Sequence, residues 1–517
     1  MKRHEQVTFK PYEQDQLLLL PPSLGELIPE GHPVRAISGV IDSLPLKPLQ
    51  TGYRGGGTSS YHPKMMLKVL VYAYSQRLYS SRRIAKALRE NVVFMWLAGG
   101  NTPDFRTINR FRGEILADAI ESVFATVIEI LIEKGYVRLE DYFVDGTKIE
   151  AQAGKYSYVW AKSTRRYKRQ LRDKIGRLLR EAEEENEAEN AQYGDHDLEE
   201  VEGEEITAED VERTVREIEE RLADKSSRSA RKAIRILRED CLPRLRRYEQ
   251  QERILGERGS YSKTDEEATF MRMKERTVAG EPLKAAYNVQ IGTENQFILG
   301  YSLHQRPGDT GCLIPHLKEW LERWGRAPQR IIADAGYGSE ENYVFLEAHG
   351  LGSYVKYNTF DREQKKRRRP KPFDSANWVY DADKDTYTCP AGKELTFKAI
   401  KHYISINGYQ SECRVYQAHE CQQCALRPEC THSQTNRQMQ SNARLQGYKR
   451  QAATNLSSPT GQTLRSRRLI EAEAVFARIK HNWGFRRFYL RGLRQTKTEW
   501  GIVALAHNLT RLATLGA

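Results

Sequence analysis

The sequence predicts an α/β protein in which a mixed sheet carries helices on both faces. Short apolar runs typical of strands recur between Tyr142 and Tyr357, and helical patterns separate the later ones. An all-α domain, residues 1–135, precedes them. Two insertions interrupt the strand pattern: a charged, helical, coiled-coil-like one at residues 158–280, and a basic, cysteine-rich one at residues 361–460. The α/β domain therefore spans residues 136–517 with two interruptions.

Composition narrows the class of partner. The chain has 517 residues, enough for several domains, with 29% charged residues and a formal net charge of +13. A net positive charge of this size favours a nucleic acid over a membrane surface as the binding partner. No apolar run approaches the roughly 18 residues of a membrane span, and no signal core follows Met1–Gln6. We therefore expect a cytoplasmic protein that does not contact a membrane.

The N-terminal domain contains several short helical patterns. The last begins at Thr102–Asp104, where a cap and a proline start a helix that we expect to run to Leu131. We expect Arg106, Arg110 and Arg112 on its exposed face. Short helices with a basic helix start are typical of a helix-turn-helix DNA-binding domain. In such a domain we expect Arg106 and Arg110 to contact DNA. The alternative is a helical bundle with solvated arginines.

Acidic residues follow two apolar strand patterns. Asp145 ends the run Tyr142–Val144, and Asp334 ends Ile331–Ala333. A carboxylate is costly to bury in such a run unless a positive charge compensates it. A metal ion does so when further acids converge, and Glu473 on a later helix is a third candidate. Each acid taken alone is more simply explained as a strand-end or capping residue, and it is the three together that favour a metal site.

The order of the predicted elements is βββαβαβ, which is that of an RNase H-like sheet. In such a sheet the first and fourth strands are neighbours, so Asp145 and Asp334 lie side by side. Two adjacent carboxylates repel each other unless a cation lies between them, and Mg²⁺ with its oxygen ligands meets that need. The predicted elements are strands over 142–149, 285–292 and 297–303, a helix capped by Asp309–Thr310, a strand over 331–334, a helix around Tyr343 and a strand over 353–357.

The insertion at residues 158–280 is rich in charged helix formers. Trp160–Arg180 is basic and Glu181–Glu205 is strongly acidic. The apolar spacing that follows suits a helical hairpin or a coiled-coil arm. A solvated helical arm is one interpretation, and contact of its basic part with DNA or a second subunit is the other.

The second insertion contains a cysteine cluster. Five of the seven cysteines lie between residues 389 and 430, which in a cytosolic chain indicates metal binding rather than disulfides. We predict a closed, structural Zn²⁺ site. A basic loop, Lys365–Lys371, is either a solvated linker or a phosphate contact. The predicted ligands are Cys389, Cys421, Cys424 and Cys430, with Cys413, His419 and His432 as spare candidates and Cys241 and Cys312 as core thiols.

The C-terminal segment returns to the α/β core. A helix predicted over Ser466–Phe476 carries Glu473, and Ile470, Val475 and Ile479 are expected to pack on the sheet. Lys480 lies seven residues after Glu473, on the same helix face. Next, Arg486, Arg487 and Arg491 stand among aromatic residues, a mixture that suits a DNA backbone and an unstacked base. A core helix with solvated arginines is the alternative.

Several stretches together resemble bacterial insertion-sequence transposases of the DDE type. In that family's signature, Tyr, Arg, Glu and Lys stand at set spacings around the catalytic Glu. Glu473 and Lys480 keep their spacing, whereas Leu469 stands where the Arg is expected, with Arg468 one position away, and Ser466 stands in place of the Tyr. Glu471 is an alternative acid. The matching stretches are Val144–Lys148, Ala333–Tyr337, Glu473–Lys480, Tyr61–Pro63, Thr102–Thr107, the cysteine insertion and Ala506–Leu509.

The resemblance implies a mechanism and partners. Two Mg²⁺ or Mn²⁺ ions would be held by Asp145, Asp334 and Glu473, with Asp145 shared, while Lys480 and Arg468 contact DNA phosphates. The substrates would be the double-stranded inverted repeats of the element and its target DNA, and pairing of two ends implies a homodimer or larger assembly beside the bacterial nucleoid. A DNA-binding regulator without catalysis and a metal-dependent nuclease without strand transfer are the alternatives.

Overall fold

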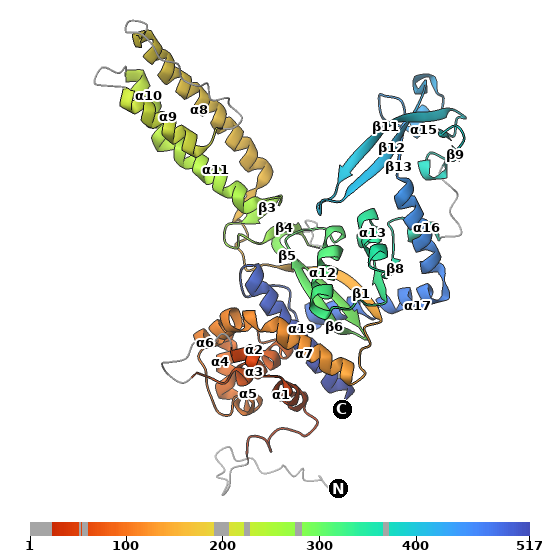
Figure 1. Cartoon of the computed structure of the whole chain (residues 1–517). Helices are drawn as coiled ribbons and strands as arrows, with labels where there is room; N and C mark the ends of the chain where they lie inside the picture. Colours follow the sequence, from red (N-terminus) through yellow and green to blue (C-terminus); the bar gives the residue numbers. More distant parts are fainter. Residues whose placement is uncertain are drawn as a thin grey trace, which may run out of the picture. The chain divides into compact units, whose positions relative to one another are not determined.

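The computed structural model describes residues 23–50, 53, 60–190, 206–221, 228–273, 282–364 and 372–516. The chain divides into two compact units. One consists of Met1–Val127 with Ile502–Ala517, and the other of Ile128–Gly501. Figure 1 labels the elements along the chain.

The first unit is helical over its described residues, as the sequence patterns predict. Side chains of His32, Asn91 and Asp104 cap three of its helices by accepting hydrogen bonds from first-turn N–H groups. Its helices are α1 (Pro33–Ser43), α2 (Lys47–Gln50), α3 (Pro63–Ser75), α4 (Ser81–Glu90), α5 (Val92–Leu97), α6 (Phe105–Arg110) and the first part of α7 (Ile120–Glu133), with the end of α19 (Leu493–Leu515).

The helix expected from Thr102 to Leu131 is interrupted. A π turn, Phe111–Ile115, and a short 3-10 turn separate α6 from α7. Arg112 lies in the π turn and is 2% exposed, so its predicted exposure is wrong. Its guanidinium donates to the Tyr74 hydroxyl at 2.9 Å and the Tyr79 carbonyl at 2.7 Å, which explains how a cation is tolerated there.

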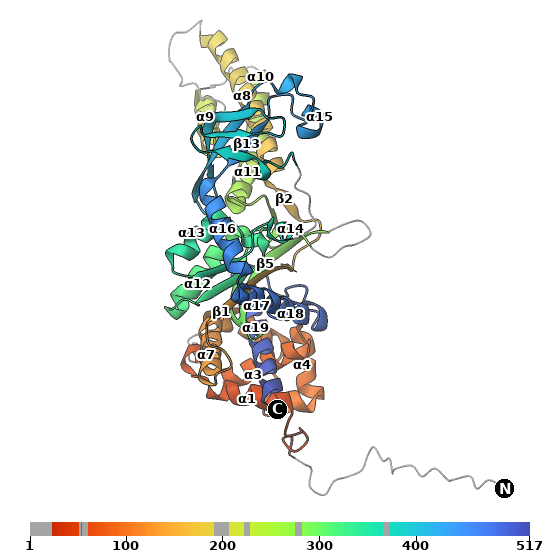
Figure 2. The same ribbon diagram turned by 90° about the vertical axis from the view of Figure 1, so that its right-hand side faces the viewer.

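The second unit is built on a mixed sheet in which β1 is antiparallel to β5 and parallel to β7. Phe143 pairs with Ile332, so Asp145 within β1 and Asp334 just after β7, each two residues further on, lie at the same level along the two strands. Figures 1 and 2 show this sheet from two directions. The strands, in the order β4-β5-β1-β7-β8 with β6 also on β5, are β1 (Asp141–Glu150), β4 (Thr269–Arg272), β5 (Leu283–Glu294), β6 (Phe297–His304), β7 (Arg330–Ala333) and β8 (Gly352–Val355).

Helices cover this sheet on both faces. Consecutive residues from Ala285 to Glu294 of β5 are all buried, and since neighbouring side chains point to opposite faces, both faces are covered. α12 contacts β6, α13 and α16 contact β8, α17 contacts β7, and α18 contacts β1 and β5. The bounds are α12 (Leu313–Trp324), α13 (Glu340–Ala348), α14 (Phe360–Glu363), α16 (Ala443–Ser457), α17 (Pro459–Arg468) and α18 (Ala472–Ala477).

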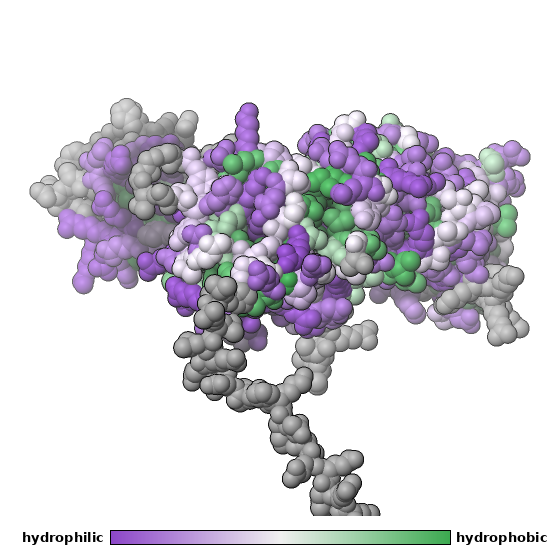
Figure 3. All heavy atoms as spheres, turned by 90° about the horizontal axis from the view of Figure 1, so that it is seen from below, coloured by the Kyte–Doolittle hydropathy of each residue, from purple (hydrophilic) through white to green (hydrophobic). Residues whose placement is uncertain are grey.

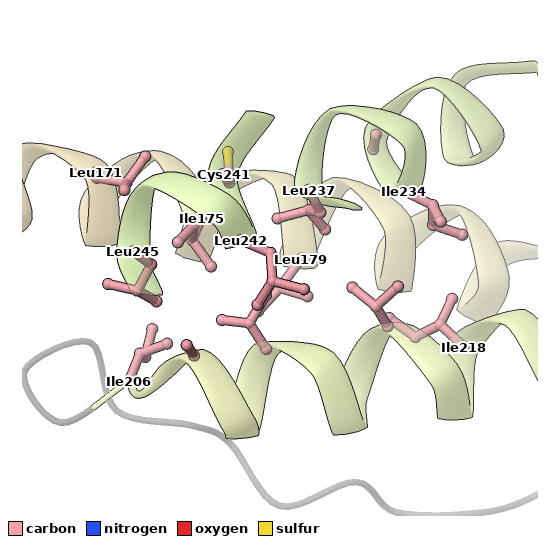
Figure 4. Close-up of a cluster of buried hydrophobic side chains, with 14 of the residues drawn as sticks. Leu171, Ile175, Leu179, Ile206, Ile218, Ile234, Leu237, Cys241, Leu242 and Leu245 are labelled. Carbon is pink, nitrogen blue, oxygen red and sulfur yellow. The ribbon is translucent and has the colours of Figure 1, made fainter. Parts of the chain in front are cut away.

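The first insertion begins and ends in a two-stranded ribbon, β2 (Tyr158–Trp160) with β3 (Ser260–Ser262). Between them, four helices share an apolar core over the described residues (Figure 4), and the last two are joined end to end by the π turn Leu237–Cys241. Cys241 is fully buried in this core, as predicted for a core thiol. Most of the acidic stretch lies outside the described residues. The helices are α8 (Ala161–Asn190), α9 (Ala208–Arg221), α10 (Arg228–Ile236) and α11 (Leu242–Leu255).

The second insertion contains an antiparallel sheet in the order β13-β12-β11-β10-β9. The hairpin of β11 and β12 dominates it, and the short helix α15 (Arg427–Cys430) carries the last cysteine of the cluster. The basic loop Lys365–Lys371 lies outside the described residues. The strands are β9 (Val379–Asp381), β10 (Thr386–Thr388), β11 (Glu394–Ile404), β12 (Gln410–Ala418) and β13 (Gln438–Ser441).

Hydrophilic side chains predominate on the face shown in Figure 3, with smaller hydrophobic patches between them. This agrees with the mean hydropathy of −0.70. Within the described ranges, no helix combines the length and the apolar character that crossing a membrane requires.

Candidate active site

Asp145 lies within β1, two residues beyond the last residue of β1 that pairs with β7, and Asp334 directly follows β7. The Oδ1 of Asp145 accepts the N–H of Gly146 at 2.9 Å, and the Oδ1 of Asp334 accepts the N–H of Gly336 at 2.8 Å. Their side chains are 14% and 38% exposed. The preceding strand residues are buried, so both carboxylates lie at the border between the core and solvent.

The helix that carries Glu473 is broken just before it. A continuous helix was expected over 466–476, but α17 ends at Arg468 and α18 begins at Ala472. Leu469, at the position expected for the Arg of the signature, is 62% exposed in the break. The break therefore offsets the one-position shift of Arg468, because residues 469–471 between Arg468 and α18 are not helical.

The break also changes what packs on the sheet. Ile470 is 56% exposed, so the prediction that it packs there is wrong. Val475 and Ile479, predicted with it, are buried. Ala472 is buried as well, so these three residues form the inward face of the segment. This agrees with the contacts of α18 with β1 and β5.

One guanidinium joins the three acids. Arg468 donates from Nη1 to Oε1 of Glu473 at 2.8 Å. Its Nη2 lies 3.5 Å from Oδ1 of Asp145 and 3.5 Å from Oδ2 of Asp334. The Arg468 side chain is 13% exposed, whereas the Asp334 and Glu473 side chains are 38% and 40% exposed, so these ion pairs are only partly shielded from water. Three carboxylates from two strands and a helix thus converge on one cation.

The donor set fits a divalent cation. Three carboxylates around one guanidinium leave negative charge that a hard, oxygen-preferring ion would neutralise. Among the described residues, no three His, Cys, Asp or Glu side chains stand close enough to form a metal site as they are. In the acid cluster the Arg468 guanidinium lies between the carboxylates, where such an ion would bind.

Glu471, the alternative acid, has a different environment. Its Oε2 accepts the N–H of Gln296 at 2.7 Å, at the turn between β5 and β6. Its Oε1 lies 3.3 Å from Arg467, which also pairs with Asp141 at 2.8 Å. Glu471 is 3% exposed, and these contacts give it a structural role in holding the helix break to the sheet.

Lys480 lies beside β1. Its Nζ donates to the Thr147 hydroxyl at 3.2 Å and lies 3.5 Å from the carbonyl of Lys148. Thr147 is two residues after Asp145, so the ammonium group is close to the strand that carries the first acid. It is held by a π turn, Arg478–Asn482, that continues α18.

Three arginines line the end of β1. The chain around Arg487 runs along this strand end, with the N–H of Phe488 donating to the Glu150 carbonyl at 2.9 Å. Arg487 donates to the carbonyl of Ala153 at 3.2 Å, and Arg491 to that of Gln152 at 2.9 Å. Arg486 donates to the carbonyl of Lys480 at 3.1 Å. The predicted arginines therefore gather at one place.

The aromatic residues among these arginines are mostly core residues. Phe485 is 1% and Phe488 0% exposed, and they pack edge to face with ring centroids 5.6 Å apart. Trp500 continues this cluster and is fully buried. Their faces are closed to a DNA base, which corrects that expectation, whereas Tyr489 is 45% exposed.

The four predicted zinc ligands line one cavity. It is bounded by Cys389, Cys421, Cys424 and Cys430 together with apolar and basic residues. Burial raises the pKa of the Cys430 thiol, Arg437 lowers it, and the three other cysteines raise it further. Four thiols that influence one another electrostatically are a donor set that suits Zn²⁺, although they do not stand at metal-ligand spacing as they are.

The spare candidates lie apart from this cavity lining. Cys413 lies in β12 opposite Lys401, and His419 bonds with the Thr396 hydroxyl at 2.9 Å. His432 does not line the cavity either. Cys312, predicted as a core thiol, is fully buried, and burial raises its pKa to about 12.

The first unit has its own basic surface. Arg106 and Arg110 on α6 are exposed, as predicted. Arg82 of α4 and Arg106 lie over the half-exposed ring of Phe105, at 5.1 and 5.7 Å from its centroid. Arg110 lies 3.5 Å from Glu114.

Two family models match the chain. A transposase DDE domain matches residues 388–513, and a transposase domain known as DUF772 matches residues 22–114. Both matches support the prediction of an insertion-sequence transposase of the DDE type. No curated protein and no solved structure matches it.

The matched regions cover part of the candidate site. Glu473, Lys480 and the cysteine cavity fall within the DDE match, and Arg106 and Arg110 within the other. β1 and β7, with the two aspartates, lie outside both.

Sequence reasoning missed one further carboxylate near the candidate site. Asp309 was expected to cap a helix, and it does precede the 3-10 turn Thr310–Cys312, but its side chain makes no capping hydrogen bond. Its Oδ1 accepts instead from Asn288 and Gln290 of β5. Polar residues at alternate positions of a buried strand were the signal that could have indicated this contact.

Proposed function

We propose that this transposase binds the ends of its insertion sequence, cleaves phosphodiester bonds there and joins the freed 3′-OH ends to target DNA. The observation that carries the proposal is the convergence of Asp145, Asp334 and Glu473 on the guanidinium of Arg468. The strand order β6-β5-β1-β7-β8 supports it, because this is the order expected of an RNase H-like sheet.

The three acids are proposed to hold two Mg²⁺ or Mn²⁺ ions, with Asp145 shared between them. When bound, such ions activate a water molecule or a DNA 3′-OH and stabilise the leaving oxygen. The chain itself supplies the oxygen ligands on rigid elements, at a site whose walls are buried strands. Arg468, already among the acids, brings a donor fork that suits a DNA phosphate.

Positive charge beside the acids is proposed to hold the DNA backbone. Lys480 would bind a phosphate next to the bond that is cut, because its ammonium group lies beside β1 only two residues from Asp145. Arg486, Arg487 and Arg491 extend this charge along the end of the same strand. In the first unit, Arg106 and Arg110 are proposed as a separate DNA contact.

The cysteine cavity is proposed to bind one structural Zn²⁺ through four thiolates. A closed site of this kind stabilises a small fold and takes no part in the chemistry. The proposed partners are double-stranded inverted repeats and target DNA, without membrane contact. A homodimer or larger assembly in the bacterial cytoplasm, close to the nucleoid, would pair the two ends.

The test is cleavage and joining of DNA that contains the ends of the element. Native protein with Mg²⁺ is expected to cut at defined positions and to join the 3′ ends to a second DNA. Asp145→Asn is expected to bind the same DNA but to lose far more activity than the about 10–100-fold typical of outer-shell partners. Asp361→Asn, which changes an exposed aspartate paired with Lys356, is the matched control.

The outcomes separate the alternatives. Cutting without joining would indicate that the protein is a metal-dependent nuclease without strand transfer. Specific binding without any cutting by the native protein would favour a DNA-binding regulator. Equal activity of Asp145→Asn and native protein would contradict the assignment of the acids.

A further inference from the structure

Asp309 is held in place by hydrogen bonds from two side-chain amides to one of its carboxylate oxygens. Its Oδ1 accepts from Nδ2 of Asn288 at 2.8 Å and from Nε2 of Gln290 at 3.1 Å. Both amide residues are fully buried in the middle of β5. Burying two amides costs stability unless their hydrogen bonds are made, so this arrangement fixes the carboxylate against the sheet.

The same network reaches the turn after Asp334. Gln290 accepts a hydrogen bond from the hydroxyl of Tyr337, which is fully buried three residues after Asp334. The Thr310 hydroxyl donates to the carbonyl of Gly336 at 2.6 Å. The loop of Asp309 and the exit of β7 are therefore locked together.

Two glycines give the position of the Asp309 carboxylate relative to the catalytic acids. A Cβ built on Gly146, the residue after Asp145, would lie 2.7 Å from Oδ1 of Asp309. A Cβ built on Gly336 would lie 3.8 Å from Oδ2 of Asp309 and 3.0 Å from Oδ1 of Asp334. The carboxylate thus lies against the residue next to the first acid and faces the turn that holds the second.

The acids near Asp309 already attract one positively charged side chain. The Arg468 guanidinium contacts the neighbouring acids, and it does so from the helix side. Asp309 lies against the strand ends and pairs with neutral amides, so its charge is not neutralised by them. A fourth carboxylate at this place adds to the attraction for a cation between the acids.

We propose that Asp309 is a fourth acid of the active site and raises its affinity for the divalent cation. This inference rests on the proposed function, because it concerns the same cation. Asp309 acts as a positioning residue that supplies charge beside Asp145 and Asp334. Asp309→Asn is the informative variant, since the asparagine oxygen still accepts from Asn288 and Gln290 and only the charge is lost.

The experiment measures cation binding directly, with Mn²⁺ as the probe, by electron paramagnetic resonance on the full-length protein. We expect Asp309→Asn to weaken Mn²⁺ binding by about 10–100-fold, the range typical of outer-shell partners. We also expect it to need more Mg²⁺ for half-maximal DNA cleavage, with the rate recovering at high Mg²⁺. Tyr337→Phe removes a hydroxyl from the same network but no charge, so its cation requirement should stay native.

The outcomes are distinct. Unchanged Mn²⁺ affinity in Asp309→Asn, or a loss of activity that Mg²⁺ does not restore and that Tyr337→Phe shares, would overturn the role of Asp309. Either result leaves the proposed function intact if native protein cleaves DNA. Native protein that binds Mn²⁺ through Asp309 but cleaves no DNA would contradict the proposed function and support the role of Asp309 in cation binding.

Discussion

Arg468 donates a hydrogen bond to Glu473 at 2.8 Å across the break between α17 and α18. The residues 469–471 between the two helices are not helical, and this lets the guanidinium turn back over the start of α18 while also reaching Asp145 and Asp334. An arginine that pairs with three acids neutralises repulsion that would otherwise oppose their approach. The same charge competes with any cation that binds there.

Arg468→Gln should therefore make stability depend on divalent ions. Without Mg²⁺, we expect the variant to lose about 1 kcal/mol of unfolding free energy, a modest value because the ion pairs are partly exposed. Mg²⁺ should restore more stability to the variant than it adds to native protein, since the ion replaces the missing charge. Thermal unfolding in EDTA and in Mg²⁺ measures both effects.

Arg213→Gln is the matched control, because Arg213 pairs with Asp210 on an exposed helix of the insertion. It should respond to Mg²⁺ as native protein does. If Arg468→Gln gains no more from Mg²⁺ than this control, the guanidinium does not stand in for a cation.

The two aspartates could be predicted from the sequence because a strand imposes a simple pattern. An apolar run that ends in an acid locates Asp145 and Asp334, and the order of the elements makes their strands neighbours, as the paired register confirms. A helix is less informative, because local pattern does not reveal a break. Leu469 and Ile470 have helical spacing in the sequence, yet they are exposed where the chain leaves the helix.

The directions of two side chains also could not be predicted from the sequence. An aspartate before a helix is normally a cap, and nothing local indicates that Asp309 instead contacts amides on β5. Arg112 has the spacing of an exposed position, but the π turn rotates it inward to the Tyr74 hydroxyl. In both cases the deciding partner is distant in the sequence.

Loss of a single cavity cysteine should release zinc. We expect purified protein to contain about one Zn²⁺ per chain and Cys424→Ser to contain much less, because structural sites need all four ligands. Burial raises the pKa of Cys430, so binding should release protons near neutral pH. Elemental analysis with thiol titration gives the zinc content and the number of free thiols.

Cys413→Ser is the control, because Cys413 does not line the cavity. It should keep its zinc. Native protein without zinc and with reactive thiols would remove the proposed site, whatever the variants show.

Buried His316 should make the second unit less stable in mild acid. Its ring contacts the Tyr142 hydroxyl at 2.9 Å and the Ser302 hydroxyl at 2.8 Å. Burial, together with the nearby charges of His304 and Arg323, lowers the pKa of His316 to about 3. The unfolded chain takes up a proton below about pH 6.5 and the folded chain does not, so stability is full above that pH and falls as the pH drops toward 3.

Between pH 6.5 and 5, this single group should cost about 1–2 kcal/mol of unfolding free energy. Urea unfolding of native protein and of His316→Gln at both pH values measures it. The variant should be less stable at pH 6.5, because it loses buried contacts, but it should lose less on acidification. His402→Gln, at an exposed site paired with Glu412, should keep the native pH dependence. Equal slopes for native protein and His316→Gln would show that His316 is not the group that titrates.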